Sequence, residues 1–273
     1  EATPSLLALR PHHAAAPLPV AAGKRAIIVM VVGRQTEAEW EISGPSIAAY
    51  AAAIGADLRI VRAAPGLPID LVKAGARDVA AEYDRFIMMD ADIVIRPHCP
   101  DLFALVPPDS VGAFPEGRHI DRRGLTEQSV AFLGGAPFPP ETYFNAGVMV
   151  LSRVHLHMLD ELGRGIVAGA LIEQNMMNVA ARRAGHPITE IDAGFNYLAL
   201  GVAQPHDWRG GWIVHLAGAP KPEFRRGTPL WERQEHAHGI AWAQRQRLGK
   251  HLRLPHLAAL AERVTGREVH VLD

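Results

Sequence analysis

The sequence predicts an α/β fold in which helices flank a mostly parallel central sheet. In the first half of the chain, short all-apolar runs of strand length alternate three times with segments whose apolar residues have helical spacing. That alternation is typical of parallel strands that are joined by right-handed crossovers and buried on both faces. The composition fits a folded chain of enzyme size, because 48% of the 273 residues are apolar and the formal net charge is −1.

Composition also excludes several classes of protein. The near-neutral charge predicts no nucleic-acid partner, since such proteins usually carry a strongly basic domain. Cys99 is the single cysteine, which excludes a disulfide framework and a cysteine-based zinc site. No apolar run reaches the ~18 residues that a membrane span needs, and the run at 6–9 is too short for a signal peptide. We therefore expect a cytoplasmic protein, and the abundance of Ala, Arg, Pro and Gly favours a bacterial source.

The first half of the chain is predicted to be regular. Residues 1–23 are rich in Ala and Pro without helical or strand periodicity, so we expect a tail or linker. Gly33 and Gly55 mark the ends of the first strand and the first helix. Strands are predicted at 26–32, 58–61 and 86–89, and helices at 46–54 and 69–83.

The second half is less regular. A Gly- and Pro-rich stretch at 115–142 is predicted to be a long loop, of the kind that is usually functional or mobile. From 230 onward the pattern is helical, with a break at Pro255. We therefore divide the chain into the tail 1–23, one α/β domain at 24–228 and a C-terminal helical extension at 229–273 packed on that domain. Further strands are predicted at 110–114, 144–151 and 212–216, and helices at 154–168 and 171–184.

Two carboxylates stand at the end of the third predicted strand. Asp90-Ala91-Asp92 directly follows its apolar residues, and open α/β sheets bind ligands at the carboxyl ends of their strands. Two neighbouring carboxylates repel each other unless a cation lies between them, which indicates a metal site. The alternative is a structural aspartate that caps the following turn.

Three later segments combine polar residues with an apolar strand or helix. Asn and Gly weaken strand pairing and are tolerated where a ligand approaches the backbone. Each segment also has a structural alternative, namely an Asn turn, a helix N-terminus and a hydrogen-bonded core histidine. The segments are Tyr143-Phe-Asn-Ala-Gly-Val-Met-Val-Leu-Ser152, Glu173-Gln-Asn-Met-Met-Asn178 and Trp212-Ile-Val-His-Leu-Ala-Gly-Ala-Pro-Lys-Pro222.

The segment around Asp90-Ala91-Asp92 also fits the opening motif of haloacid-dehalogenase-like phosphatases, in which one Asp is a nucleophile and the other a general acid. That motif usually lies on the first strand of the core, whereas here it follows the third. No convincing later acidic pair for magnesium is present. The sequence favours this interpretation least.

Taken in order, the four motifs are similar to those of GT-A glycosyltransferases. They most closely resemble glycosyltransferase family 8, which includes glycogenin and bacterial lipooligosaccharide galactosyltransferases. The resemblance covers about residues 25–223 and consists of strand-Asp-x-Asp, Phe-Asn-Ala-Gly-Val, an acidic residue before Gln, and His-x-x-Gly-x-x-Lys-Pro. Two positions depart from the family, which usually has Asp at Glu173 and Trp at Glu223. Residues 46–57 are also similar to a related galactosyl/mannosyltransferase family of fungal Golgi enzymes. The implied fold is GT-A, a Rossmann-like nucleotide-sugar-binding fold.

The resemblance implies a metal site formed by Asp90, Asp92 and His215. Two carboxylates and one imidazole suit Mn²⁺ better than Mg²⁺, because nitrogen ligands favour the softer ion; Mg²⁺ is the alternative. A further set of residues is implied to contact the sugar-nucleotide donor. This set is Val32, Lys73, Asp90, Asn145, Ala146, Gly218 and Lys221.

The implied catalytic residues are Gln174 beside the anomeric carbon and Glu173, which would orient the sugar hydroxyls. Glu116 and Asp121 lie in the loop region that such relatives use near the sugar, without a motif that aligns them. Such relatives retain the anomeric configuration. A double displacement would need a carboxylate nucleophile, for which Glu173 is the candidate.

The activity implied by the resemblance is metal-dependent transfer of a hexose from a nucleotide-diphosphate donor, with UDP as the expected nucleotide. The acceptor would be a glycan, a lipid-linked sugar or a small molecule. The alternative from another class is a non-catalytic GT-A-like module that binds sugar nucleotides.

The region from Lys221 to His256 is basic, with eight Lys and Arg against three Glu, and Trp231 and Trp242 lie within it. It suits either a solvated helical cover for the sheet edge or a surface for peripheral contact with anionic lipid at the inner membrane face. Nothing in it predicts irreversible anchoring. The sequence leaves the oligomeric state open.

Overall fold

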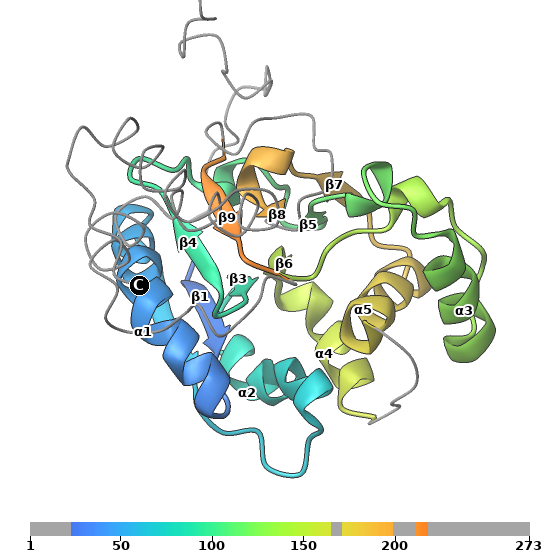
Figure 1. The fold of residues 1–273 in the computed structure, drawn as a ribbon, viewed down its shortest axis with the longest axis horizontal. Coiled ribbons are helices and arrows are strands. Elements are labelled where there is room, and N and C mark those ends of the chain that lie inside the picture. Colours follow the sequence, from blue (N-terminus) through green and yellow to red (C-terminus); the bar gives the residue numbers. More distant parts are fainter. Residues whose placement is uncertain (1–22, 165–170, 199–210, 218–273) are drawn as a thin grey trace, which may run out of the picture.

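The computed structural model describes residues 23–164, 171–198 and 211–217 (Figure 1). These residues form a six-stranded sheet in the order β2-β1-β3-β6-β5-β7 and a three-stranded sheet in the order β4-β9-β8. The strands of the large sheet are β1 Arg25–Met30, β2 Asp57–Val61, β3 Arg85–Met89, β5 Val111–Ala113, β6 Val148–Ser152 and β7 Ile188–Glu190. Those of the small sheet are β4 Ile93–Ile95, β8 Tyr197–Leu198 and β9 Ile213–His215.

The large sheet is parallel except at β6. Strand β1 pairs in parallel with β2 and β3, and β5 pairs in parallel with β7. Strand β6 runs antiparallel to both of its neighbours, β3 and β5. The predicted α/β fold with a mostly parallel central sheet is confirmed, whereas the reversal of β6 was not predicted. Because β6 is reversed, its first residues lie at the same edge of the sheet as the last residues of β1 and β3.

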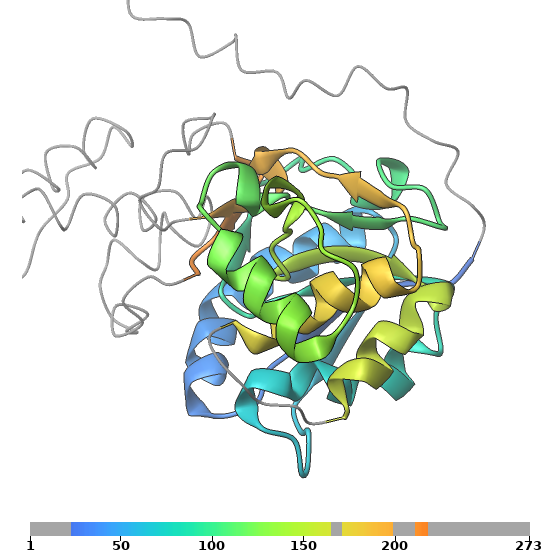
Figure 2. The same ribbon diagram turned by 90° about the vertical axis from the view of Figure 1, so that its right-hand side faces the viewer.

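Helices cover both faces of the large sheet (Figure 2). The α-helices are α1 Arg34–Ala53, α2 Arg77–Ala80, α3 Arg123–Leu133, α4 Leu156–Leu162 and α5 Ile172–Arg183. The longest 3₁₀ segment is η2, Ile69–Ala76, and short 3₁₀ turns lie at Leu102–Ala104, Glu116–Arg118, Pro140–Thr142, Arg153–His155 and Ala193–Phe195. In the part of the chain that the structure describes, we find no helix with the length and apolar character that a membrane crossing requires.

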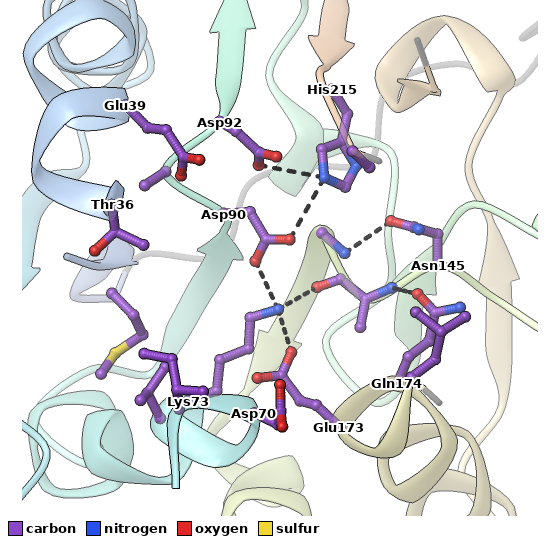
Figure 3. A pocket seen from close by; sticks show the side chains of 18 of the residues that line it. Thr36, Glu39, Asp70, Lys73, Asp90, Asp92, Asn145, Glu173, Gln174 and His215 are labelled. Carbon is purple, nitrogen blue, oxygen red and sulfur yellow. Dashed lines mark hydrogen bonds and ion pairs between the residues drawn. The ribbon is translucent and has the colours of Figure 1, made fainter. Parts of the chain in front are cut away.

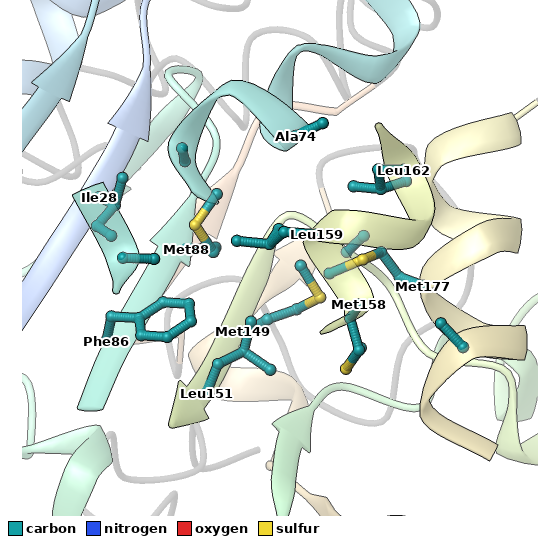
Figure 4. Close-up of a cluster of buried hydrophobic side chains, with 14 of the residues drawn as sticks. Ile28, Ala74, Phe86, Met88, Met149, Leu151, Met158, Leu159, Leu162 and Met177 are labelled. Carbon is teal, nitrogen blue, oxygen red and sulfur yellow. The ribbon is translucent and has the colours of Figure 1, made fainter. Parts of the chain in front are cut away.

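Side chains of the central strands alternate between two buried clusters. Ile28 and Met88 point to one face, where they pack with residues of η2, α4 and α5 (Figure 4). Their neighbours Ile27 and Ile87 point to the other face and pack with residues of α1 and the small sheet. Since both faces are buried, every position after the arginine that begins each of these strands is apolar, which explains the continuous apolar runs in the sequence.

Two predicted helices have different bounds in the structure. Helix α1 begins at Arg34 rather than at residue 46, so Pro45 lies inside it. A proline inside a helix removes a backbone hydrogen bond and usually ends the helix, which is why the sequence predicted a later start. The predicted helix at 69–83 is mainly 3₁₀ in η2 and ends with the single turn α2.

Other predictions fail in the second half. The predicted loop at 115–142 contains α3, a helix that buries only Thr126 and Ser129 and therefore lacks a strong apolar stripe. The strand predicted at 144–151 begins only at Val148, because the polar contacts of the preceding residues replace strand pairing. The short strands β4, β7 and β8 were not predicted.

Several predictions lie outside the described residues. They concern the tail at 1–22, the end of the helix predicted at 154–168, the helical extension at 229–273, and the residues Gly218 and Lys221.

Candidate active site

A cavity of about 550 Å³ opens where β1 and β3 end and β6 begins (Figure 3). Met30 ends β1, Asp90 directly follows β3, and Gly147 directly precedes β6; all three residues line the cavity. The start of α5 contributes Glu173 and Gln174. Parallel strands of α/β sheets place their ligands at this edge, so the fold itself positions the cavity at the expected binding site.

Asp90, Asp92 and His215 meet at one side of this cavity. Strand β4 begins directly after Asp92 and pairs with β9 so that Ile93 lies opposite His215, which brings the imidazole beside the carboxylates. The His215 Nε2 atom lies 3.4 Å from Asp90 Oδ2 and 3.4 Å from Asp92 Oδ1. One ligand atom from each residue lies within 4.8 Å of the other two. Two carboxylates and an imidazole at this spacing could hold a divalent cation.

The other ring nitrogen of His215 is held by a buried amide. The Nδ1 atom lies 2.9 Å from Asn196 Oδ1, and the amide nitrogen of Asn196 donates to Asn145 Oδ1 at 2.9 Å. Since that amide presents its oxygen to the ring, Nδ1 carries the hydrogen and Nε2 is the atom directed at the carboxylates. Second hydrogen bonds of this kind fix the tautomer and orientation of metal-binding histidines.

Because Gly147 has no side chain, the His215 ring can occupy the space beside its backbone. A Cβ atom added to Gly147 would lie 2.0 Å from Cε1 of His215, far below any contact distance between carbon atoms. The backbone of the same residue also accepts a hydrogen bond from the Asp90 amide at 2.9 Å. The requirement for glycine here is therefore steric.

The charges of the site shift the pKa values of its members. Burial alone would lower the pKa of His215, but the neighbouring carboxylates of Asp92 and Asp90 raise it to about 9. Burial alone would raise the pKa of the Asp90 carboxyl, but Lys73 and His215 hold it well below its usual range. In the absence of a cation, the site therefore contains ionised Asp90 and a protonated imidazole. A bound cation would displace that proton.

Lys73 links Asp90 to the start of α5. Its Nζ atom lies 2.7 Å from Asp90 Oδ1 and 2.5 Å from Glu173 Oε1, and it donates to the Ala146 carbonyl at 2.9 Å. Burial opposes its charge, but the carboxylates of Asp90 and Glu173 raise the pKa of Lys73 above its usual value. Burial raises the pKa of Glu173 against the effect of Lys73. The sequence predicted that Lys73 contacts the donor. The structure shows that Lys73 pairs with both carboxylates.

A buried glutamate, Glu116, orients two amide side chains that line the cavity, those of Asn145 and Gln174. Gln174 accepts a hydrogen bond from the Ala146 amide at 3.0 Å and donates to Glu116 Oε1 at 2.7 Å. Asn145 donates to Glu116 Oε2 at 2.9 Å. Glu116 is fully buried and pairs with Arg122 at 2.7 Å. This carboxylate thus orients Asn145 and Gln174, a role that no sequence pattern indicated.

The remaining predicted site residues lie in different places. Val32 is half-buried, packs against the apolar cluster of η2, α4 and α5, and is not among the lining residues of the cavity. Asp121 is exposed and pairs with Arg123. Thr36, Glu39 and Asp70 line the cavity without having been predicted. Asp70 belongs to the predicted helix at 69–83, and the residues between 33 and 46 were assigned to no element.

Comparison with known proteins identifies the fold. No protein-family profile and no curated protein sequence match this chain. It is similar to the structure of a glycosyltransferase involved in the glycosylation of the major capsid of PBCV-1, with 16% identity and a TM-score of 0.51 over 74% of this chain and 96% of that one. It is also similar to the apo structure of the bifunctional glycosyltransferase WbbM, with 13% identity and a TM-score of 0.50 over 84% of this chain. The match covers 52% of WbbM, so this chain spans about half the length of that protein. The chain has the GT-A fold of glycosyltransferases.

Proposed function

We propose that this protein is a metal-dependent glycosyltransferase that moves a sugar from a nucleotide-diphosphate donor to an acceptor hydroxyl. The observation that carries the proposal is the convergence of Asp90, Asp92 and His215 with the Lys73–Glu173 pair in one cavity. The GT-A fold is consistent with this activity.

Asp90, Asp92 and His215 would hold the cation, with Mn²⁺ expected from the mixed oxygen and nitrogen ligands. A divalent cation held there would neutralise negative charge on a diphosphate leaving group. Gly218 and Lys221, which lie outside the described residues, are proposed to contact the same diphosphate. A UDP-linked hexose is the proposed donor, following the resemblance to family 8.

The backbone at Ala146 is the proposed platform for the donor sugar. Lys73 donates to its carbonyl and Gln174 accepts from its amide, so both sides of this residue are fixed. Groups that are fixed before the reaction stabilise a transition state without reorganising. In this arrangement Gln174 acts by positioning the platform, and Glu173 presents a partly exposed carboxylate to the cavity.

We further propose that the anomeric configuration is retained. Glu173 is the carboxylate on the α5 side of the cavity; burial raises its pKa, and the ion pair with Lys73 opposes that shift. It would stabilise positive charge on the anomeric carbon or act as the nucleophile of a double displacement. Determination of the anomeric configuration of the product tests this part, and inversion would refute it.

Two alternatives fit the site less well. A module that only binds sugar nucleotides has little need for a buried lysine between two carboxylates, because burying charges costs stability. A phosphatase of the haloacid-dehalogenase type needs a further acidic pair for magnesium. Among the described residues, the one group with metal-ligand spacing is Asp90, Asp92 and His215.

The test is a screen for hydrolysis of UDP-, GDP- and dTDP-sugars with Mn²⁺ or with a chelator. We expect hydrolysis of one donor with Mn²⁺, none with chelator, and a loss of at least about a hundredfold in Asp92→Asn. Asp121→Asn is the matched control, because Asp121 is exposed and pairs only with Arg123 among the residues that the structure describes. Binding of UDP with Mn²⁺ but no hydrolysis or transfer would support the binding module instead. Full activity in chelator would refute the metal site.

A further inference from the structure

Two exposed aliphatic side chains line the cavity that holds the charged groups. Ile69, at the start of η2, is 61% exposed, and Leu171, directly before α5, is 45% exposed. Both line the same cavity as Lys73 and Glu173. Isolated exposed apolar residues are common on protein surfaces, but a pair on the rim of a binding cavity is the arrangement that recognises an apolar part of a ligand.

The two elements that carry these side chains are joined inside the cavity. Lys73 belongs to η2, one turn after Ile69, and Glu173 lies two residues after Leu171. The 2.5 Å ion pair between Lys73 and Glu173 joins the two elements at this point. Val72 and Ile172 also line the cavity, so apolar side chains extend from the rim toward the charged groups. We call Ile69, Val72, Leu171 and Ile172 the aliphatic rim.

Leu171 adopts a conformation that leucine rarely takes. Its φ of 54° and ψ of 37° are left-handed, which is unfavourable for a residue with a Cβ atom. Asn or Gly would fit this conformation better, and either would remove apolar surface from the rim. A strained, exposed leucine at a binding cavity is consistent with a functional role for its side chain.

We propose that the acceptor is amphipathic and that its aliphatic chain packs on the aliphatic rim while its hydroxyl enters the cavity. This inference rests on the proposed function, because it assigns the acceptor of that same site. The rim favours an alkyl chain over an aryl group, because none of the cavity-lining residues described by the structure is Phe, Tyr or Trp, and the one lining imidazole, that of His215, faces the carboxylates of Asp90 and Asp92. Asp70, which follows Ile69 in the chain and lies beside Glu173, offers a carboxylate to the polar part of such an acceptor (Figure 3).

The test compares methyl, n-octyl and phenyl β-D-glucoside, with the octyl compound below its critical micelle concentration. Binding is measured by isothermal titration calorimetry with and without UDP and Mn²⁺. We expect the octyl compound to bind about tenfold more tightly than the other two, because burial of several methylene groups on the rim adds affinity. The variants Ile69→Ser and Leu171→Asn should each reduce that preference, and the double variant should abolish it. Asn at position 171 keeps the left-handed conformation accessible, so the variant removes apolar surface rather than the turn.

Val154→Ser is the matched control, since Val154 is 59% exposed and does not line the cavity. It should keep the full octyl preference. Equal binding of all three glucosides by the wild-type protein, or a preference that survives in the double variant, would overturn the inference. Equal gain from the octyl and phenyl groups would overturn the assignment of an alkyl chain. Failure to bind UDP with Mn²⁺ would refute the proposed function, whereas the glucoside series without UDP still tests the rim.

Discussion

A buried histidine lies near each end of strand β6, and the groups that surround the two rings differ in charge. At the start of β6, the ring of His215 packs against Gly147 and faces the carboxylates of Asp90 and Asp92. Beyond the other end, His155 packs against the ring of His186, with the ring centroids 4.5 Å apart. Its Nδ1 atom accepts a hydrogen bond from the Ser152 amide at 2.9 Å.

The same burial leads to opposite protonation at these two histidines. Burial and the neighbouring His186 lower the pKa of His155 to about 4, whereas the carboxylates overcome burial and raise the pKa of His215 to about 9. A buried histidine is therefore neutral and structural when its neighbours are uncharged or basic. When two carboxylates face it, a buried histidine becomes protonated, and a metal cation can then replace that proton. The following predictions test this difference.

The largest effect is expected from Lys73→Met. This change removes the ammonium group that pairs with both Asp90 and Glu173. Because two carboxylates then remain in the cavity without that partner, we expect the free energy of unfolding to fall by about 3–5 kcal/mol in the presence of chelator. Urea denaturation measures it. Arg153→Met is the control, because the Arg153–Asp84 pair is more than half exposed and should contribute about 0–1 kcal/mol. Equal losses in the two variants would show that the charges of the cavity are not mutually stabilised.

Gln174→Ala should lower kcat about a hundredfold and leave UDP affinity nearly unchanged, because Gln174 positions the Ala146 backbone at the proposed sugar site and misplacement there raises the barrier of the transfer step. Steady-state kinetics and UDP titration separate the two effects. Asn178→Ala is the matched control on the same helix, since Asn178 holds the backbone of Phe144 instead. That variant should lose stability without a comparable loss of rate. An equal loss of UDP binding in Gln174→Ala would contradict a positioning role that is confined to the transfer step.

Asn196→Leu should weaken Mn²⁺ binding about ten- to a hundredfold, because the Nδ1 hydrogen of His215 loses its acceptor and the tautomer is no longer fixed. Titration followed by electron paramagnetic resonance measures free Mn²⁺ directly. Asn196→Asp keeps an acceptor for Nδ1 and should recover part of the affinity. Unchanged binding in Asn196→Leu would show that the carboxylates alone orient the ring.

The smallest effect concerns His155. Because its pKa in the folded protein lies below that of an unfolded histidine, unfolding takes up a proton between pH ~6.5 and about 4. The contribution of His155 to the free energy of unfolding is therefore fully present above pH ~6.5 and is lost as the pH falls toward 4. An imidazole resonance that titrates near pH 4 in NMR spectra would confirm the assignment. A resonance that titrates near 6.5 would mean that the ring is solvated, and the contrast with His215 would fail.

Much of the fold could be predicted from the sequence because its central strands are continuous apolar runs. The meeting of Asp90, Asp92 and His215 was also predicted, from a strand end and a resemblance of motifs, and the structure brings these three side chains together. Elements without apolar periodicity were missed. Helix α3 buries little apolar surface, and α1 contains Pro45, so neither could be recognised fully from local pattern.

The polar support of the site could not be predicted for a different reason. Glu116 and Asn196 belong to short irregular segments, and their importance depends on partners that are distant in the sequence. A buried carboxylate and a surface carboxylate look alike in a sequence. Glu116 is fully buried whereas Asp121, five positions later, is exposed, and only the packing of the chain distinguishes them.

The pairing of β4 with β9 has a consequence for protein synthesis. Asp92 leaves the ribosome early, with the first half of the large sheet, but the strand that carries His215 follows only after nearly all of the described residues. N-terminal parts of a chain generally begin to fold first. A nascent chain that ends before β9 therefore presents an acidic pair and the unpaired edge of β4, but no complete cation site. Fragments that end before β9 should fail to bind Mn²⁺ even where the large sheet has formed, because β9 is the strand that completes the cation site.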